Sequence, residues 1–177
     1  YSDTWRCSKA LNGGGILIDQ GIHLVDLMSH LAGGIDGAQA VLSSNYLNIA
    51  GVEDNGFITL YSISNKISAS IHTTVTQWRY LFSLEIFLEK GSIVLNGIRT
   101  KSGNYGDEIL TIKPNAQNEK KISFTEEIFT ENTSWQKEID AFLLSCDTGV
   151  NYPYAEFGDA QKTTALIDLI YKEATWI

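Results

Sequence analysis

The sequence predicts an α+β fold, in which helices pack on one face of a largely antiparallel, open-faced sheet. Three observations predict it. Residues 16–32 carry apolar side chains at helical period, alternating runs typical of strands follow from about 38 to 125, and two further helical patterns occupy about 133–147 and 157–174. One helix, a run of strands and two more helices is the order of an α+β domain rather than of repeated βαβ units.

The first helix is predicted over residues 16–32, directly after Asn12 and three consecutive glycines. Its apolar residues recur at helical spacing and cover a wide arc. The helix is expected to end at Gly33-Gly34, because residues without a Cβ readily adopt the left-handed conformation that closes a helix. The apolar set is Leu17, Ile18, Ile22, Leu24, Val25, Met28, Leu31 and Ala32.

The central part of the chain has the period of two that is typical of strands with one buried face. Apolar and polar residues alternate along 67–76, with Ser64-Asn65 as the preceding turn. Glu89-Lys90-Gly91 separates two further apolar runs. Because these connections are so short, the paired strands are predicted to be antiparallel hairpins.

The last two helices are separated by Gly149 and Pro153, which mark a break. The first of them carries a stripe of Trp135, Ile139, Phe142 and Cys146, and the second carries Ala160, Thr163, Ile167, Ile170 and Ala174. We find no repeat or linker and therefore expect residues 1–177 to form a single domain.

Composition and charge narrow the possible partners and location. The chain has a net charge of -8 and no basic cluster, which argues against binding to nucleic acid or to an anionic membrane. No apolar run approaches the roughly 20 residues that span a bilayer. The two cysteines, Cys7 and Cys146, show neither metal-binding nor disulfide spacing, so a reducing cytoplasm is the expected location.

Four polar residues of the first helix form the main candidate site. Asp19, His23, Asp26 and His30 follow one another at spacings of four, three and four, which places them on one stripe opposite the apolar arc. A carboxylate one turn from a histidine can fix its tautomer and suit it to acid/base chemistry. The same spacing also fits a helix face that is exposed to solvent. Such faces are usually built from Lys, Glu and Arg, which are better helix formers than Asp and His. Gly21 lies near the apolar arc, where the missing side chain permits a close backbone approach.

Two other functions remain open on the residues alone. Asp19 and His23 are suitably spaced to hold a metal ion in a lyase or hydrolase, with His72, Glu85 or Asp54 as the third ligand. The chain also suits a non-catalytic carbohydrate-binding or assembly module.

A longer motif connects the chain to a known family. Trp5-Arg6 followed by GGGILIDQGIHLVDLMSHLAGG resembles the start of the C-terminal domain of the Gfo/Idh/MocA oxidoreductases, whose pattern is GG-x-L-x-D-x-G-x-H-x-x-D. The match includes Asp19, Gly21, His23 and Asp26. The resemblance continues through VEDNGFITLYSISNKISASIHTTVTQWR and LEIFLEKGSIVLNG and covers nearly the whole chain.

The resemblance implies a glyceraldehyde-3-phosphate-dehydrogenase-like C-terminal fold and a two-domain enzyme. In this family an N-terminal Rossmann domain holds NAD or NADP, while the C-terminal domain supplies an open sheet, much of a sugar pocket and commonly a homo-oligomer interface. The family's Glu-Lys-Pro motif, with its catalytic lysine, is absent here, and no strand is followed by GxGxxG. We therefore expect the cofactor to be bound mainly by an N-terminal domain absent from this chain, and the chain alone to be inactive.

The substrate implied by the resemblance is the hydroxyl or keto group of a sugar, nucleotide-sugar or polyol, with surface-polysaccharide biosynthesis as the nearest context. By position, His23 is the acid/base, and Asp19 binds substrate and orients His23. Asp26 is interpreted as a structural hydrogen-bonding residue, and His30 is given no catalytic role.

Five further residues are candidates for lining the pocket, because an aromatic face stacks on a sugar ring and a guanidinium binds hydroxyl or phosphate oxygens. They are Trp5, Arg6, Gln77, Trp78 and Arg79. Core packing of the two tryptophans and an ordinary surface role for Arg79 remain open alternatives.

Overall fold

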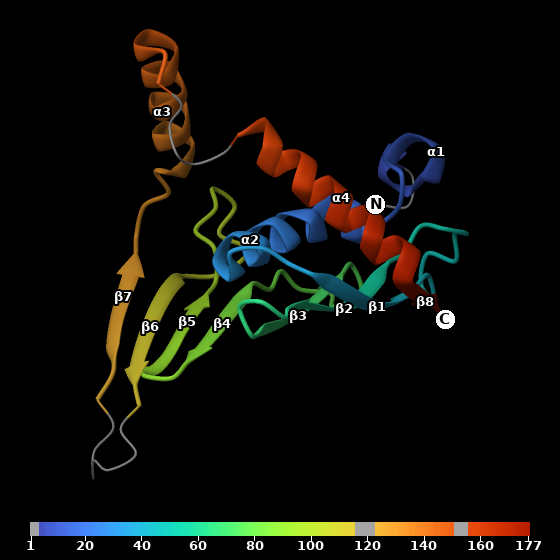
Figure 1. Ribbon diagram of the computed structural model, residues 1–177, viewed down its shortest axis with the longest axis horizontal. Helices are drawn as coiled ribbons and strands as arrows, with labels where there is room; N and C mark the ends of the chain where they lie inside the picture. The colour runs from blue at the N-terminus through green and yellow to red at the C-terminus, as the bar shows by residue number, and fades with distance from the viewer. Residues whose placement is uncertain (1–3, 116–122, 151–155) are drawn as a thin grey trace. The chain divides into compact units, whose positions relative to one another are not determined.

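The α+β fold is confirmed in a computed structural model, which describes residues 4–115, 123–150 and 156–177 (Figure 1). These residues form two compact units. The first contains 4–78 and 156–177, and the second contains 79–115 and 123–150. No helix within the described ranges is long and apolar enough to cross a bilayer.

The first unit is a four-stranded sheet of order β3-β2-β1-β8 with helices on one face (Figure 1). Neighbouring strands are antiparallel except for β1 and β8, which run parallel. The strands are β1 (Gly37–Ser43), β2 (Asn55–Ser62), β3 (Ile67–Thr74) and β8 (Ala174–Trp176). The helices are η1 (Trp5–Cys7), α1 (Lys9–Asn12), η2 (Leu17–Gly21), α2 (Ile22–Ala32) and α4 (Phe157–Glu173).

The core of this unit lies between the sheet and helices α2 and α4. Inward-pointing strand residues meet the apolar arc of α2 and one side of α4, as the alternating pattern predicted. The fully buried side chains include Leu17, Val25, Leu42, Ile58, Leu60, Ile167 and Ile170. Leu31, which belonged to the predicted apolar arc, is 48% exposed.

The other face of this sheet is open. Phe57 and His72 stack across β2 and β3 with ring centroids 4.1 Å apart, and Val41 is exposed on β1. His72 Nε2 also lies 2.8 Å from the Asn55 side-chain oxygen. Partial burial lowers the pKa of His72 below its usual value. Val41, Phe57 and His72 therefore lie side by side on exposed positions of three neighbouring strands.

The C-terminus corrects one predicted boundary. The last helix was expected to reach residue 174, but α4 ends at Glu173 and the chain continues as β8. Pairing with β1 decides this, because the edge of β1 offers unpaired backbone groups, and the Ile177 amide donates to Leu42 O at 3.1 Å. Of the predicted stripe on α4, Thr163, Ile167 and Ile170 are buried, whereas Ala160 is exposed.

The second unit contains an antiparallel four-stranded sheet of order β4-β5-β6-β7 and one helix. Its elements are β4 (Ser83–Leu88), β5 (Gly91–Asn96), β6 (Glu108–Pro114), β7 (Thr125–Phe129) and α3 (Ser134–Thr148). The predicted hairpin at Glu89-Lys90 is confirmed. The expected run of strands thus pairs as two sheets rather than one.

Helix α3 is present where the periodicity predicted it, but its apolar stripe does not pack as expected. Trp135, Ile139 and Phe142 are exposed, and no residue of α3 is buried. Gly149, with a φ of 68°, ends the helix as predicted, whereas Pro153 lies outside the described residues.

Candidate functional site

The candidate helix begins at a tight junction between two backbone segments. Gly15 lies so close to Glu53 that an added Cβ would overlap its main-chain oxygen, and a Cβ at Gly14 would overlap the Tyr171 hydroxyl. The Ile16 amide donates to Glu53 O at 2.9 Å. These contacts explain why glycines precede the helix: the missing side chains let the chain pass against the end of the sheet.

The first turn of the helix is wider than predicted. Residues Leu17–Gly21 form a π-helical turn, η2, which continues directly into α2. π-helical turns are rare in proteins, and a large share of those known lie at functional sites. Gly21 has its missing Cβ position about 3.1 Å from Thr73 of β3, which confirms the close approach inferred from the sequence.

The π turn sets Asp19 apart from the other members of the predicted stripe. The Asp19 side chain is only 11% exposed, whereas His23, Asp26 and His30 are exposed. The four residues of the predicted stripe therefore differ in exposure, and Asp19 does not share the exposed surroundings of the other three.

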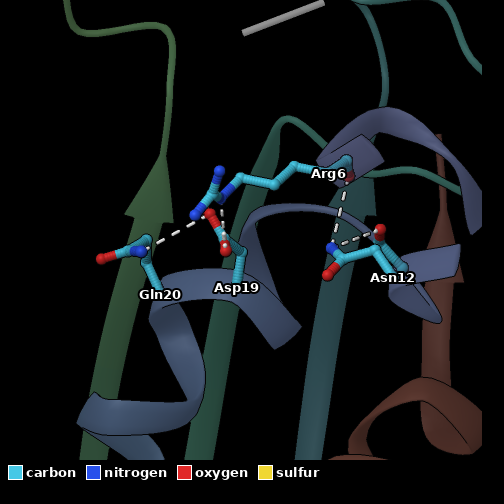
Figure 2. Close-up of polar contacts among 5 residues, drawn as sticks. Arg6, Asn12, Asp19 and Gln20 are labelled. Carbon is cyan, nitrogen blue, oxygen red and sulfur yellow. Dashed lines mark hydrogen bonds and ion pairs between the residues drawn. The ribbon is translucent and has the colours of Figure 1, made fainter. Parts of the chain in front are cut away.

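Asp19 forms an ion pair with the N-terminal segment (Figure 2). The Arg6 Nε donates to Asp19 Oδ1 at 3.1 Å, and the Gln20 side-chain Nε2 donates to Asp19 Oδ2 at 3.4 Å. The Arg6 guanidinium also lies 4.7 Å from the ring centroid of Trp5. Two of the predicted pocket residues, Trp5 and Arg6, are therefore gathered beside Asp19.

Asn12 ties this segment to the glycine loop. Its side-chain nitrogen donates to Arg6 O at 3.3 Å and to Gly14 O at 3.1 Å (Figure 2). The Arg6 side chain is 41% exposed, whereas that of Asp19 is mostly buried. Trp5 is exposed and does not pack in the core, which answers the alternative left open for it.

The remaining helix residues differ in their surroundings. His23, the predicted acid/base, is exposed on the first turn of α2, directly after the π turn that carries Asp19. Asp26 accepts a hydrogen bond of 2.5 Å from the Thr163 hydroxyl of α4, which agrees with the structural role predicted for it. Near His30, the hydrogen bonds from Lys162 and from the Glu156 amide lower the pKa of the Asp159 carboxyl, and the charge of His30 adds the smallest share.

The other predicted pocket residues are placed separately. The Gln77 side chain lies 3.5 Å from His72 Nδ1, and His72 belongs to the open face of the sheet. Trp78 is 74% exposed, has a φ of 55° and meets Tyr46 edge to face at 5.0 Å. Trp78 therefore does not pack in the core, and its positive φ is a rare conformation for a bulky residue. Arg79 is exposed and belongs to the second unit.

Sequence reasoning missed the buried Glu53 at the start of the helix, and it considered the neighbouring buried Asp54 only as a metal ligand. The Glu53 carboxylate accepts hydrogen bonds from the Gly15 amide at 3.0 Å, the Leu17 amide at 2.8 Å and the Tyr171 hydroxyl at 2.8 Å. Asp54 accepts two amides, from Tyr46 and Leu47, both at 2.7 Å. The only sequence signal for these buried carboxylates was their adjacency in VEDN. Neighbouring acidic residues are far more common on protein surfaces, so this signal did not predict burial.

Two of the proposed third metal ligands do not join Asp19 and His23. The Asp54 carboxylate accepts the amides of Tyr46 and Leu47, and His72 stacks on Phe57 on the other face of the sheet. Glu85 belongs to the second unit. Within 4–115, 123–150 and 156–177 there is no group of three His, Cys, Asp or Glu residues arranged to hold a metal ion.

Comparison with known families and structures identifies the fold. A family model described as the GFO/IDH/MocA C-terminal domain matches residues 1–94. The chain belongs to this family. The match contains the glycine loop, the π turn, Asp19 and His23, and the family is one of oxidoreductases, so the resemblance inferred from the motif is confirmed.

Solved structures show the same fold at low sequence identity. A putative NADPH-dependent oxidoreductase from Desulfitobacterium hafniense superposes with a TM-score of 0.78 at 14% identity, over 96% of this chain and 48% of that one. The WlbA dehydrogenase from Bordetella pertussis, in complex with NADH and UDP-GlcNAcA, gives 0.66 at 22% identity, over 96% and 45%.

A third structure is the UDP-N-acetylglucosamine 3-dehydrogenase GnnA from Acidithiobacillus ferrooxidans. It gives a TM-score of 0.72 at 13% identity, over 90% of this chain and 48% of that one. The chain thus spans about half the length of these structures. No curated protein matched the chain.

Proposed function

We propose that this chain is the substrate-binding half of an NAD(P)-dependent dehydrogenase that acts on a hydroxyl or keto group of a sugar, nucleotide-sugar or polyol. The observation that carries the proposal is the ion pair between Arg6 and Asp19, a residue of the π turn that precedes His23. Family membership supports oxidoreductase chemistry. Two structures of the same fold concern UDP-sugars, which supports a sugar-type substrate.

The residues of this chain can move a proton and hold a polyhydroxylated substrate. During oxidation, His23 accepts the proton of the reacting hydroxyl, and in the reverse direction it returns that proton to the carbonyl oxygen. Asp19 binds a neighbouring hydroxyl and orients the imidazole. Arg6 donates to substrate oxygens, and Trp5 offers a ring face. A bound nicotinamide cofactor would supply the hydride acceptor.

The cofactor is proposed to be held mainly by an N-terminal domain outside this chain, and the chain alone to be inactive. Asp19, His23 and Arg6 are suited to binding the substrate and moving its proton. The sequence has no GxGxxG loop after a strand, which is the motif that binds the pyrophosphate of a dinucleotide. The proposal includes a cytoplasmic location, because the sequence has only two cysteines, far apart and without disulfide or metal-binding spacing.

The function is tested by assaying the full-length protein with NAD or NADP against a panel of sugars, polyols and nucleotide-sugars. Formation of reduced nicotinamide, dependent on one class of these substrates, is the expected result. Tight binding of a panel member without any turnover would favour the non-catalytic carbohydrate-binding module instead.

Replacing Arg6 by alanine is expected to raise the KM of the full-length enzyme by about tenfold or more, with a smaller effect on kcat. A hydrogen bond from a charged donor contributes about 1.5–3 kcal/mol, which corresponds to this factor. Steady-state kinetics measure the change. Arg99→Ala is the matched control, because Arg99 forms an ion pair with Asp107 in the second unit. If the two substitutions change KM equally, Arg6 does not bind the substrate.

The open face of the first sheet is proposed to bind the same face of a second copy. Phe57, 53% exposed in its stack on His72, lies on this face with Val41. Phe57→Glu is expected to shift the assembly to monomers, because a buried unpaired carboxylate opposes association. Sedimentation velocity measures the mass. Leu31→Glu, at an exposed apolar position on α2, should leave it unchanged, and an unaltered mass in the Phe57 variant would contradict this interface.

A further inference from the structure

One buried side chain holds the start of the candidate helix. Glu53 has no exposed surface, and its two carboxylate oxygens accept the amides of Gly15 and Leu17. Its main-chain oxygen accepts the amide between them, that of Ile16. A single residue from the segment before β2 therefore satisfies three successive amides.

These are the amides that a helix cannot satisfy by itself. The first N–H groups of a helix have no partner within it, and a local Ser, Thr or Asp usually supplies one. No side chain caps η2 or α2 locally. The Glu53 carboxylate supplies the missing acceptor from a distant part of the chain, and its negative charge suits the positive end of the helix dipole.

The third partner of the carboxylate anchors it to the last helix. The Tyr171 hydroxyl donates to Glu53 Oε1 at 2.8 Å. Burial, together with the neighbouring charge of Glu53, raises the pKa of Tyr171 well above its usual value, so the phenol stays protonated and remains a donor. Glu53 is thereby fixed on both sides.

We propose that Glu53 is a positioning residue for catalysis: by binding the amides of residues 15 and 17, it sets the π turn that carries Asp19 ahead of His23. The inference rests on the proposed function, because it assigns a role relative to the Asp19 and His23 pair. Gly15 packs so closely against the main chain of Glu53 that an added Cβ would not fit between them. The two segments therefore have little room to move relative to each other. Any displacement of Glu53 is therefore transmitted to Asp19, two residues after Leu17.

Asp54 provides a matched control in the same segment. It is as buried as Glu53, but it binds the amides of Tyr46 and Leu47 in the loop between β1 and β2. Asp54→Asn and Glu53→Gln remove the same charge from adjacent buried positions. Only Glu53→Gln places an amide NH2 against donors of the glycine loop and the π turn.

The experiment compares wild type, Glu53→Gln and Asp54→Asn in the full-length protein, with cofactor and the panel substrate that wild type turns over fastest. Glu53→Gln is expected to lower kcat per folded enzyme at least tenfold, with KM changed less than threefold. Asp54→Asn should keep kcat within twofold. The pH profile of kcat should keep its shape in Glu53→Gln, because a positioning residue exchanges no proton with substrate. Amide hydrogen exchange at Gly15 and Leu17 should accelerate in Glu53→Gln alone.

Each contrary result has a distinct meaning. Unchanged kcat per folded enzyme, or equal losses in the two variants, overturns the positioning role while leaving the dehydrogenase function intact. Loss of one limb of the pH profile also overturns it, because Glu53 would then act as an acid or base itself. Wild type without any turnover would instead refute the proposed function. If Glu53→Gln fails to fold, Glu53→Asp takes its place, because it keeps the charge but is one methylene shorter. The same fall in kcat is expected for Glu53→Asp, and an unchanged kcat would overturn the positioning role.

Discussion

Replacing His23 by alanine is expected to lower the kcat of the full-length enzyme by a factor of about 100 to 10,000, the range typical of a lost general acid/base. The reason is chemical: without the imidazole, the proton of the reacting hydroxyl must leave to water while the hydride is transferred. Substrate binding should change much less, because His23 acts on the proton in the transition state rather than on the bound ground state. Steady-state kinetics across pH measure both parameters.

His30→Ala is the matched control for this substitution. His30 is exposed on the same helix two turns later, and its position matches no catalytic position of the family motif. It should leave kcat within about twofold, as expected of a surface position. If the two histidine variants have equal turnover, the acid/base role assigned to His23 is wrong.

The elements that sequence predicted well are those whose pattern is local. The apolar periodicity of α2 and α4 and the turns at Ser64-Asn65 and Glu89-Lys90 depend on neighbouring residues, and all of them appear in the structure. The motif from Gly14 to Asp26 also predicted the family correctly. Local propensity and spacing were sufficient in these cases.

The features that sequence missed depend on distant partners. The π turn starts at a junction made by Glu53, which is 36 residues from Leu17, and Glu53 is in turn fixed by Tyr171, 118 residues further on. Strand β8 exists because β1 offers it an edge. A regular α-helix was the sound prediction for residues 16–32, and only tertiary contacts change its first turn.

Replacing Gly15 by alanine is expected to lower the free energy of unfolding by about 3 kcal/mol or more, at the upper end of the range for overpacked sites. An added Cβ would overlap the main-chain oxygen of Glu53 and lie 2.6 Å from its nitrogen. Because both groups belong to the backbone, a rotamer change cannot relieve the overlap. The junction must open, and the three amide contacts of Glu53 weaken with it. Urea unfolding measures the loss.

Gly158→Ala is the control that separates crowding from the loss of a glycine as such. Gly158 lies in the first turn of α4, and a Cβ there meets no heavy atom within 4 Å. Alanine should therefore stabilise α4 by up to about 1 kcal/mol, since it favours the helix more than glycine does. A Gly15 variant as stable as wild type would show that the junction yields easily. In that case Glu53 could not hold Asp19 in place, so the stability of this one variant bears directly on the positioning role.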